Sequence, residues 1–142
     1  MGLHTSIPEP VIIRSIEALT IRGRMLLRTT SEEGATGIAM VNDRLAYLWP
    51  ILRDFVVPVF AGRDARDLPT LIDEVYVERS AYKLAGLALW CPVAYVELSL
   101  LDMLGKLARV WGKKTVWRCA GRFSLFVAHG QVAAGHFPFH HG

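Results

Sequence analysis

Three histidines near the C-terminus carry the most obvious metal chemistry in the sequence. His136, His140 and His141 have imidazole groups that could bind a zinc ion. Pro138 lies between them and would break a helix, the element that places ligands four residues apart on one face. No cysteine or carboxylate lies nearby in the sequence to complete a ligand set. The pattern therefore favours a disordered or tag-like tail over a metal site.

Ser124 and His129 are residue types that a nucleophilic enzyme could use. Such enzymes often hold the serine on a sharp turn between a strand and a helix, within the pattern G-x-S-x-G. Ser124 has no such pattern around it and lies in residues 122–129, which could form one more strand. We therefore expect no nucleophilic catalysis from this pair.

Two acidic pairs, Glu32-Glu33 and Asp73-Glu74, could be considered for acid–base or Mg²⁺ chemistry. Adjacent residues on a helix do not share a face, which argues against the second pair. The first pair lies in a predicted turn, so neither pair makes a convincing site. We expect both to be solvated surface charges.

The net charge of +3 comes from scattered basic residues, with one tight group at Lys113, Lys114 and Arg118. Val116 and Trp117 are interleaved with this group, as in some nucleic-acid-binding surfaces. A solvated linker after a helix is the favoured interpretation, because the group is small and stands alone. No nucleic-acid partner is expected.

The length of 142 residues fits one domain with a real core. A complete eight-stranded α/β barrel needs about 250 residues and is excluded. The hydrophobic content of 52% and the mean hydropathy of +0.30 are high for a small domain. We therefore expect some apolar surface that another domain or subunit covers.

A membrane span is the competing explanation for this apolar composition. The longest uncharged apolar run, Leu84 to Val96, is shorter than the roughly 20 residues that a span requires. The N-terminus has no basic segment followed by an apolar stretch, so no signal peptide is evident. Cys91 and Cys119 form no disulfide or metal pattern and are expected to be reduced packing residues. The sequence predicts a cytoplasmic protein without a membrane partner.

Extended segments come first along the chain. Residues 11–21, 25–30 and 35–41 predict three short strands, joined by a turn at residues 22–24 and a polar reversal that ends in Gly34. Gly37, inside the third strand, indicates a close backbone approach or a bulge. Alternation in the first strand is imperfect, since Ser15 and Glu17 share a face with Ile13. The sheet is therefore covered unevenly, or the register is displaced by one residue.

Helical periodicity follows. One helix is predicted to begin at Pro50 and to end at Pro58 and Gly62, and a second is predicted from an N-cap at Asp67 to Gly86. A third helix is predicted from Pro92 towards Arg109 and is apolar around most of its circumference. Its Asp102 and Lys106 lie four residues apart, a spacing that allows an ion pair on one face of the helix. The fold class is therefore α+β, a three-stranded antiparallel meander followed by a bundle of about three helices.

The order and spacing of several motifs resemble the N-terminal capping domain of the enolase superfamily, in its mandelate racemase/muconate lactonizing enzyme type. The resemblance covers residues 11–118, and residues 119–142 would be a divergent tail or a vestige of the first barrel strand. Its motifs are Gly34, Gly37, the triplet Gly62-Arg63-Asp64, and the segment Asp102-Met103-Leu104-Gly105-Lys106.

The resemblance implies that catalytic chemistry lies outside this chain. In the family, a base removes the proton α to a carboxylate, and Mg²⁺ held by three acidic side chains of a (β/α)8 barrel stabilises the enediolate. We therefore expect no catalytic residue and no cofactor in this chain, and a fragment that is inactive alone. The implied partner is a catalytic barrel domain or a second copy of the chain. An acid sugar or another carboxylate would be the substrate only when the barrel is present.

The capping domain of the family shapes specificity through two loops, one after the first strand and one after the third. The matching positions are Arg22, Gly23, Arg24, Met40, Val41 and Asn42. Arg22 and Arg24 could bind a carboxylate substrate, because guanidinium pairs with carboxylates through two hydrogen bonds. A solubilising role in the hairpin turn is favoured for the isolated chain.

The sequence departs from the family pattern at two places. Gly37-Ile38-Ala39-Met40 replaces the usual Gly-x-Gly-Glu, and residues 109–121 replace the usual junction with the first barrel strand. A non-catalytic α+β module for protein interaction or oligomerisation is the alternative function, supported by the high hydropathy.

Overall fold

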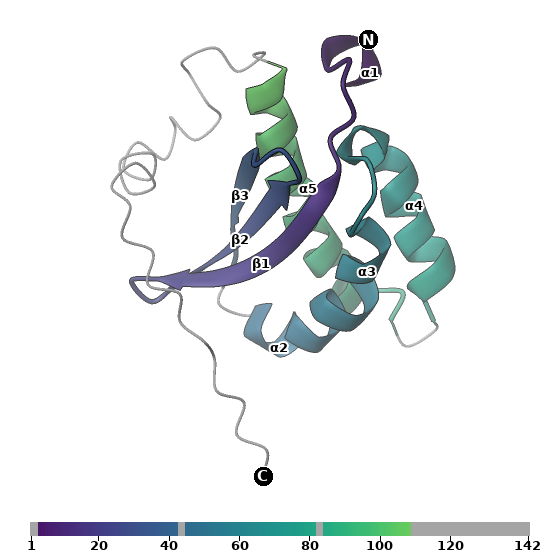
Figure 1. Cartoon of the computed structure of the whole chain (residues 1–142). Helices are drawn as coiled ribbons and strands as arrows, with labels where there is room; N and C mark the ends of the chain where they lie inside the picture. Colours follow the sequence, from purple (N-terminus) through teal and green to yellow (C-terminus); the bar gives the residue numbers. More distant parts are fainter. Residues whose placement is uncertain (1–2, 43–44, 82–83, 109–142) are drawn as a thin grey trace.

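The computed structural model describes residues 3–42, 45–81 and 84–108 (Figure 1). A short helix α1 (Leu3–Ser6) precedes three strands, β1 (Ile13–Ile21), β2 (Arg24–Ser31) and β3 (Thr36–Met40). The strands form one antiparallel sheet in the order β1-β2-β3. The predicted meander is confirmed, while the strand suggested for residues 122–129 lies outside the described residues.

A β-bulge explains the imperfect alternation in the first strand. Ile13 pairs with Ser31, and the next paired residue, Ser15, is already opposite Thr30. The extra residue moves the following side chains to the other face, so Ile16 and Ala18 join Ile13 against the core. The displaced-register alternative of the sequence analysis is therefore the correct one.

The first predicted helix begins earlier than expected and is not a single regular α-helix. It consists of α2 (Leu45–Ile51), a π-helical segment η1 (Leu52–Val56) and α3 (Val57–Phe60). Pro50 lies inside α2, so its prediction as the start of the helix was wrong. A proline there removes a backbone donor and crowds the preceding turn, and the wider π turn follows directly. Pro58 does not end the helix either; α3 ends at Phe60, and the predicted Gly62 follows two residues later with a φ of +76°.

The next helix, α4 (Leu68–Arg79), is preceded by a 3-10 turn η2 (Ala65–Asp67). Asp67 occupies the predicted N-cap position, but its side chain makes no capping hydrogen bond there. The side chain of Asp64 instead accepts a hydrogen bond from the backbone N–H of Arg66. The helix ends at Ser80, so the predicted end at Gly86 was also wrong.

Gly86 is the N-cap of the longest helix, α5 (Leu87–Leu107). The predicted start at Pro92 was therefore too late, and this buried proline lies inside the helix. By length and hydropathy alone, α5 is the one helix among residues 3–42, 45–81 and 84–108 that could cross a membrane. That apolar stretch is longer than the run from Leu84 to Val96. Its side chains facing the sheet are part of the core, as expected for the central helix of a packed domain.

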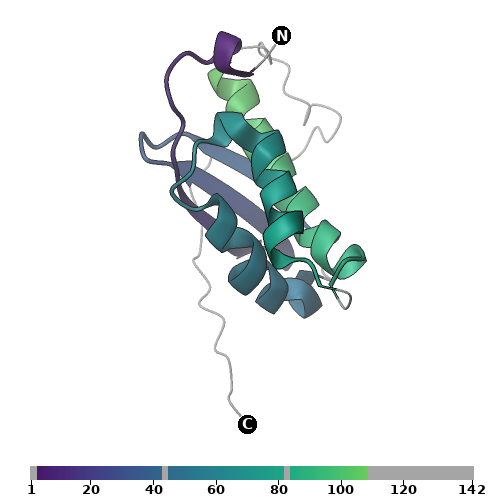
Figure 2. The same cartoon turned by 90° about the vertical axis from the view of Figure 1, so that its right-hand side faces the viewer.

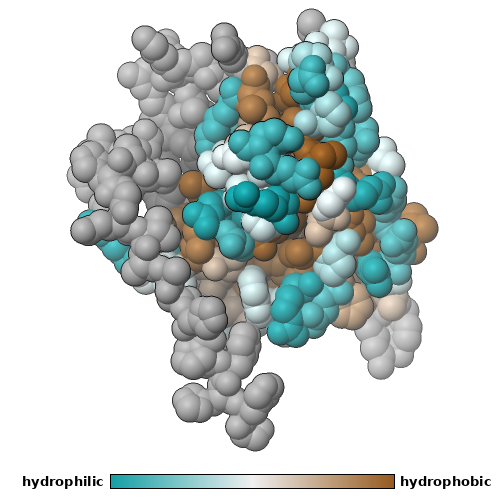
Figure 3. All heavy atoms as spheres, viewed as in Figure 1, coloured by the Kyte–Doolittle hydropathy of each residue, from teal (hydrophilic) through white to brown (hydrophobic). Residues whose placement is uncertain are grey.

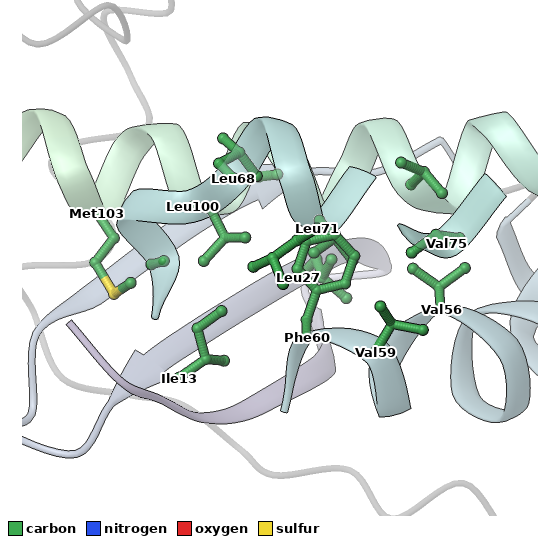
Figure 4. Packing of buried hydrophobic residues seen from close by; sticks show 14 of the residues in the cluster. Ile13, Leu27, Val56, Val59, Phe60, Leu68, Leu71, Val75, Leu100 and Met103 are labelled. Carbon is green, nitrogen blue, oxygen red and sulfur yellow. The ribbon is translucent and has the colours of Figure 1, made fainter. Parts of the chain in front are cut away.

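The helices cover one face of the sheet (Figures 1 and 2). Figure 4 shows the core between these layers, where Phe60 of α3 lies beside Leu71 of α4 and Leu27 of β2, and all three are fully buried. Leu100 and Met103 extend the core along α5. Hydrophobic surface remains visible between the hydrophilic residues in Figure 3, as the composition predicted.

Candidate functional site

The two segments predicted to shape specificity meet at one end of the sheet. Ile21 pairs with Arg24 at the closed end of the first hairpin, and Leu26 pairs with Met40 near the end of β3. The backbone N–H of Val41 continues this ladder and donates to the carbonyl of Met25 over 3.1 Å. Residues 22–24 and 40–42 therefore form one continuous edge, which we call the loop edge.

The hairpin turn at the loop edge is as short as a hairpin turn can be. Arg22 and Gly23 both have positive φ angles, +49° and +74°. Two successive positive angles are the signature of a two-residue type I′ turn, which matches the twist of the strands. Arg22 and Arg24 are both exposed on this turn. The turn can offer positive charge to a ligand, but it reaches only a short distance beyond the sheet.

The second segment of the loop edge is held by α5. The backbone N–H of Asn42 donates to the hydroxyl oxygen of Tyr95 over 3.3 Å. Val41 is buried, Met40 is half-buried and Asn42 is exposed. The end of β3 is therefore anchored on the helix, with Asn42 facing outwards.

Asp102 and Lys106 fasten α5 to the outer strand. Oδ2 of Asp102 accepts the backbone N–H of Ile38 at 2.9 Å and also the ammonium of Lys106 at 2.5 Å. Nζ of Lys106 donates in addition to the carbonyl of Thr36 over 3.2 Å. The predicted pairing within α5 is confirmed, but its contact with β3 was not foreseen. This part of the Asp-x-x-Gly-Lys motif is thus structural and holds the strand that leads to the loop edge.

Gly37 allows β3 to lie directly on α5. A Cβ added to Gly37 would stand 1.8 Å from the carbonyl oxygen of Ser99 and 2.7 Å from the backbone nitrogen of Met103. No side chain fits at those distances, so the predicted close backbone approach is confirmed. The contact brings the sheet and the helix together beneath the loop edge.

A buried polar pair, which sequence reasoning missed, lies at the same contact. Oγ of Ser99 donates to the carbonyl of Val96 over 2.8 Å and lies 2.6 Å from Oγ1 of Thr29. Since the one hydroxyl proton of Ser99 is used by Val96, Thr29 is the donor to Ser99. Both residues are fully buried, and both hydroxyl groups have partners.

The Gly62-Arg63-Asp64 triplet joins the first strand to the helices. The carboxylate of Asp64 accepts the backbone N–H groups of Val11 and Arg66 and pairs with the Arg66 guanidinium at 2.7 Å. Burial alone would raise the pKa of Asp64, but the hydrogen bonds from Arg66 and Val11 outweigh it and lower that pKa to about 2. Arg63 pairs with Glu74. One carboxylate of the pair Asp73-Glu74 therefore has a structural partner.

The loop edge offers the positive charge of Arg22 and Arg24 and a backbone shape that is fixed by hydrogen bonds. Among residues 3–42, 45–81 and 84–108, no three histidine, cysteine, aspartate or glutamate side chains come together as a metal site. Mg²⁺, the ion that the resemblance implies, therefore finds no fitting ligand set among these described residues. Residues Ser124, His129, His136, His140 and His141, considered above, lie outside the described residues.

Comparison with known proteins places the chain beside a group of bacterial enzymes. No protein-family model matches the sequence. A D-mannonate dehydratase from Caulobacter vibrioides is 33% identical over 101 residues, which are 68% of this chain and 25% of that enzyme. A D-mannonate dehydratase from a Sphingomonas species is 32% identical over 103 residues, again 25% of its length. The chain thus spans about a quarter of the curated relatives it matches.

Solved structures agree with the fold. A mandelate racemase/muconate lactonizing protein from Paracoccus denitrificans, in complex with magnesium, superposes with a TM-score of 0.54 and 24% identity. That match covers 68% of this chain and 28% of that chain. A muconate cycloisomerase from Azorhizobium caulinodans superposes with a TM-score of 0.52 and 21% identity, covering 69% and 28% of the two chains.

Proposed function

Since this chain belongs to the enolase superfamily, in its mandelate racemase/muconate lactonizing branch, we propose that it acts as the capping domain of an enzyme of that branch. The observation that carries the proposal is the loop edge. Residues 22–24 and 40–42, distant in sequence, are held side by side at one end of the sheet. A capping domain needs such an edge to close over a catalytic site.

In this proposal, the catalytic chemistry of the enzyme comes from a barrel domain that lies outside the matched segment. The relatives named above are about four times longer than the matched segment. Mg²⁺ and the acid–base groups would be supplied by that barrel, and the chain alone would be inactive. The two dehydratases favour an acid sugar as the substrate, and Arg22 and Arg24 would meet its carboxylate.

A complementation assay tests this function. The full chain is mixed with the C. vibrioides dehydratase from which the matched first quarter has been removed, and Mg²⁺-dependent dehydration of D-mannonate is measured. We expect no turnover by the chain alone and turnover by the mixture. Turnover by the chain alone would contradict the proposal. The proposal would also fail if the truncated dehydratase regained activity when mixed with its own first quarter but not when mixed with this chain.

Two charge reversals distinguish a role of the loop edge in substrate binding from mere stabilisation of the truncated dehydratase by the added chain. Arg24→Glu changes the loop edge, whereas Arg14→Glu changes an exposed arginine at the opposite end of the same sheet. We expect Arg24→Glu to raise the KM of the mixture for D-mannonate and Arg14→Glu to leave it unchanged. Equal effects of the two variants would argue against a role for the loop edge in substrate binding.

Self-association is the second candidate function, and a different surface favours it. The outward face of α5 is apolar and exposed, and another copy of the chain could cover it.

A cytoplasmic location belongs to the main proposal, because Cys91 is a free, half-buried thiol of the kind that persists in reducing compartments.

A further inference from the structure

Tyr95 of α5 connects the hydrophobic core to the loop edge. Its ring is half-buried and packs against the core, while its hydroxyl oxygen accepts the backbone N–H of Asn42 over 3.3 Å. This hydrogen bond is exposed to solvent, so water could take the place of the hydroxyl group at little cost to folding. The hydroxyl group therefore contributes to the position of Asn42 more than to the stability of the chain.

The same face of α5 holds the whole length of β3. Lys106 donates to the carbonyl of Thr36 at the start of the strand, and Asp102 accepts the backbone N–H of Ile38 in its middle. Tyr95 precedes Asp102 by seven residues and Lys106 follows it by four, a spacing that places all three on one side of the helix. The hydrogen bond of Tyr95 extends this row past the end of the strand, to the loop edge.

The backbone of Asn42 is held from two helices. Its N–H donates to Tyr95 of α5, and its carbonyl accepts the backbone N–H of Leu45, the first residue of α2, over 2.8 Å. Fixing both backbone groups of a residue also fixes the direction of its Cα–Cβ bond. The exposed side chain of Asn42 therefore leaves the loop edge in a direction that the two helices determine.

We propose that Tyr95 is a positioning residue for substrate binding, which acts through the backbone of Asn42. In the proposed function, on which this role rests, residues 40–42 close over the acid sugar. The Tyr95 hydroxyl group sets where this segment lies relative to α5 and does not itself touch the substrate. A segment that is already ordered loses less conformational entropy when it binds a ligand. Tyr95 therefore strengthens substrate binding without taking part in the chemistry.

Removal of the Tyr95 hydroxyl group should change KM and leave kcat unchanged. Tyr95→Phe keeps the ring in the core and removes only the acceptor of the Asn42 N–H. The catalytic groups belong to the barrel in the proposed function, so the variant loses binding and not chemistry. We expect the KM of the complemented mixture for D-mannonate to rise about three- to tenfold, which corresponds to about 0.7–1.4 kcal/mol.

Tyr76→Phe is the matched control. It removes the same group from a tyrosine of α4 that stacks on Trp90 and lies outside the loop edge. Its KM should equal that of the parent chain, and the urea unfolding midpoints of both variants should match the parent as well. A Tyr95→Phe variant with an unchanged KM would overturn the proposal. A lowered unfolding midpoint for Tyr95→Phe alone would also overturn it, because the hydroxyl group would then serve folding.

Amide exchange measured by NMR tests the hydrogen bond in the chain alone, without a dehydratase. In Tyr95→Phe the exchange rate at Asn42 should rise roughly fivefold or more, because the N–H loses the partner that protects it. The N–H of Val41 donates to the carbonyl of Met25 and is the internal control, whose exchange should not change. An exchange rate at Asn42 equal to that of the parent would show that Tyr95 does not hold the segment, and would overturn the proposal.

Failure of the positioning role can be told apart from failure of the capping role. If the parent chain restores turnover and Tyr95→Phe has the same KM, the positioning role is wrong and the capping role stands. If the parent chain restores no turnover to a truncated dehydratase that its own first quarter rescues, the capping role is wrong. The role of Tyr95 in substrate binding then falls with it, even where exchange at Asn42 confirms the hydrogen bond.

Discussion

Gly37 lies directly against the backbone of Ser99, so closely that a methyl group on Gly37 would stand 1.8 Å from the Ser99 carbonyl oxygen. The contact joins β3 to α5, and β3 leads into the segment at residues 40–42. The position of the loop edge relative to the helices therefore depends on the absence of a side chain at one residue.

Gly37→Ala should be among the most destabilising single changes in the chain. The added methyl group meets backbone atoms, which cannot rotate away, so the sheet and α5 must separate. We expect a loss of about 3 kcal/mol or more in the free energy of unfolding by urea, at the upper end of overpacking effects. Gly86→Ala is the control, because a Cβ there meets nothing within 4 Å. Similar losses for both variants would contradict the close approach.

Asp102→Ala should destabilise the chain more than Lys106→Met. Removal of the carboxylate leaves the backbone N–H of Ile38 without its partner, at a cost of about 1–3 kcal/mol. The Lys106 side chain is 42% exposed, and such an ion pair contributes at most about 1 kcal/mol. Urea unfolding measures both losses. Amide exchange at Ile38 gives a local check, since it should accelerate only in Asp102→Ala.

The order of the elements was predictable because its signals are local. Turn glycines separate three apolar runs, and the change to helical spacing after residue 43 is clear in the sequence. The helix starts were wrong at Pro50 and Pro92, because proline usually marks a first turn and here lies inside a helix. Tertiary packing decides that outcome: Pro92 is buried in the core, and a π segment follows α2.

Thr29 and Ser99 should show strong energetic coupling. Ser99→Ala leaves the Thr29 hydroxyl buried without its acceptor, which costs about 1–3 kcal/mol. Thr29→Val should cost less, since Ser99 keeps its bond to the carbonyl of Val96. In the double variant no polar group is stranded at this pair, so its loss should be smaller than the sum of the single losses. Additive losses in urea unfolding would show that the two hydroxyl groups do not act together.

The candidate site was only partly visible in the sequence. The resemblance supplied the segments 22–24 and 40–42, and the strand register then showed that they share an edge. The contacts of Tyr95 with Asn42 and of Asp102 with Ile38 join residues 53 and 64 positions apart. Ser99 stands as a single polar residue between leucines, and Thr29 is one of several polar residues in a row from Arg28 to Ser31. No local pattern identifies such partners, because packing of the helix on the sheet creates them.

Asp64 should make stability depend on pH in acid. Its pKa is lowered to about 2 from 3.8, so the charged form is stabilised by folding. Above pH 4 this contribution is fully present, and it disappears as pH falls through the folded pKa; by linkage it amounts to about 2 kcal/mol. Urea unfolding measures the free energy of unfolding of the parent chain and of Asp64→Asn between pH 5 and pH 2. The difference between the two should shrink as the pH falls. Asp73→Asn, which removes an exposed acid from α4, is the matched control and should leave the acid profile of the parent almost unchanged. A gap between the parent and Asp64→Asn that stays constant down to pH 2 would show that the carboxylate charge is not what joins Val11 to Arg66.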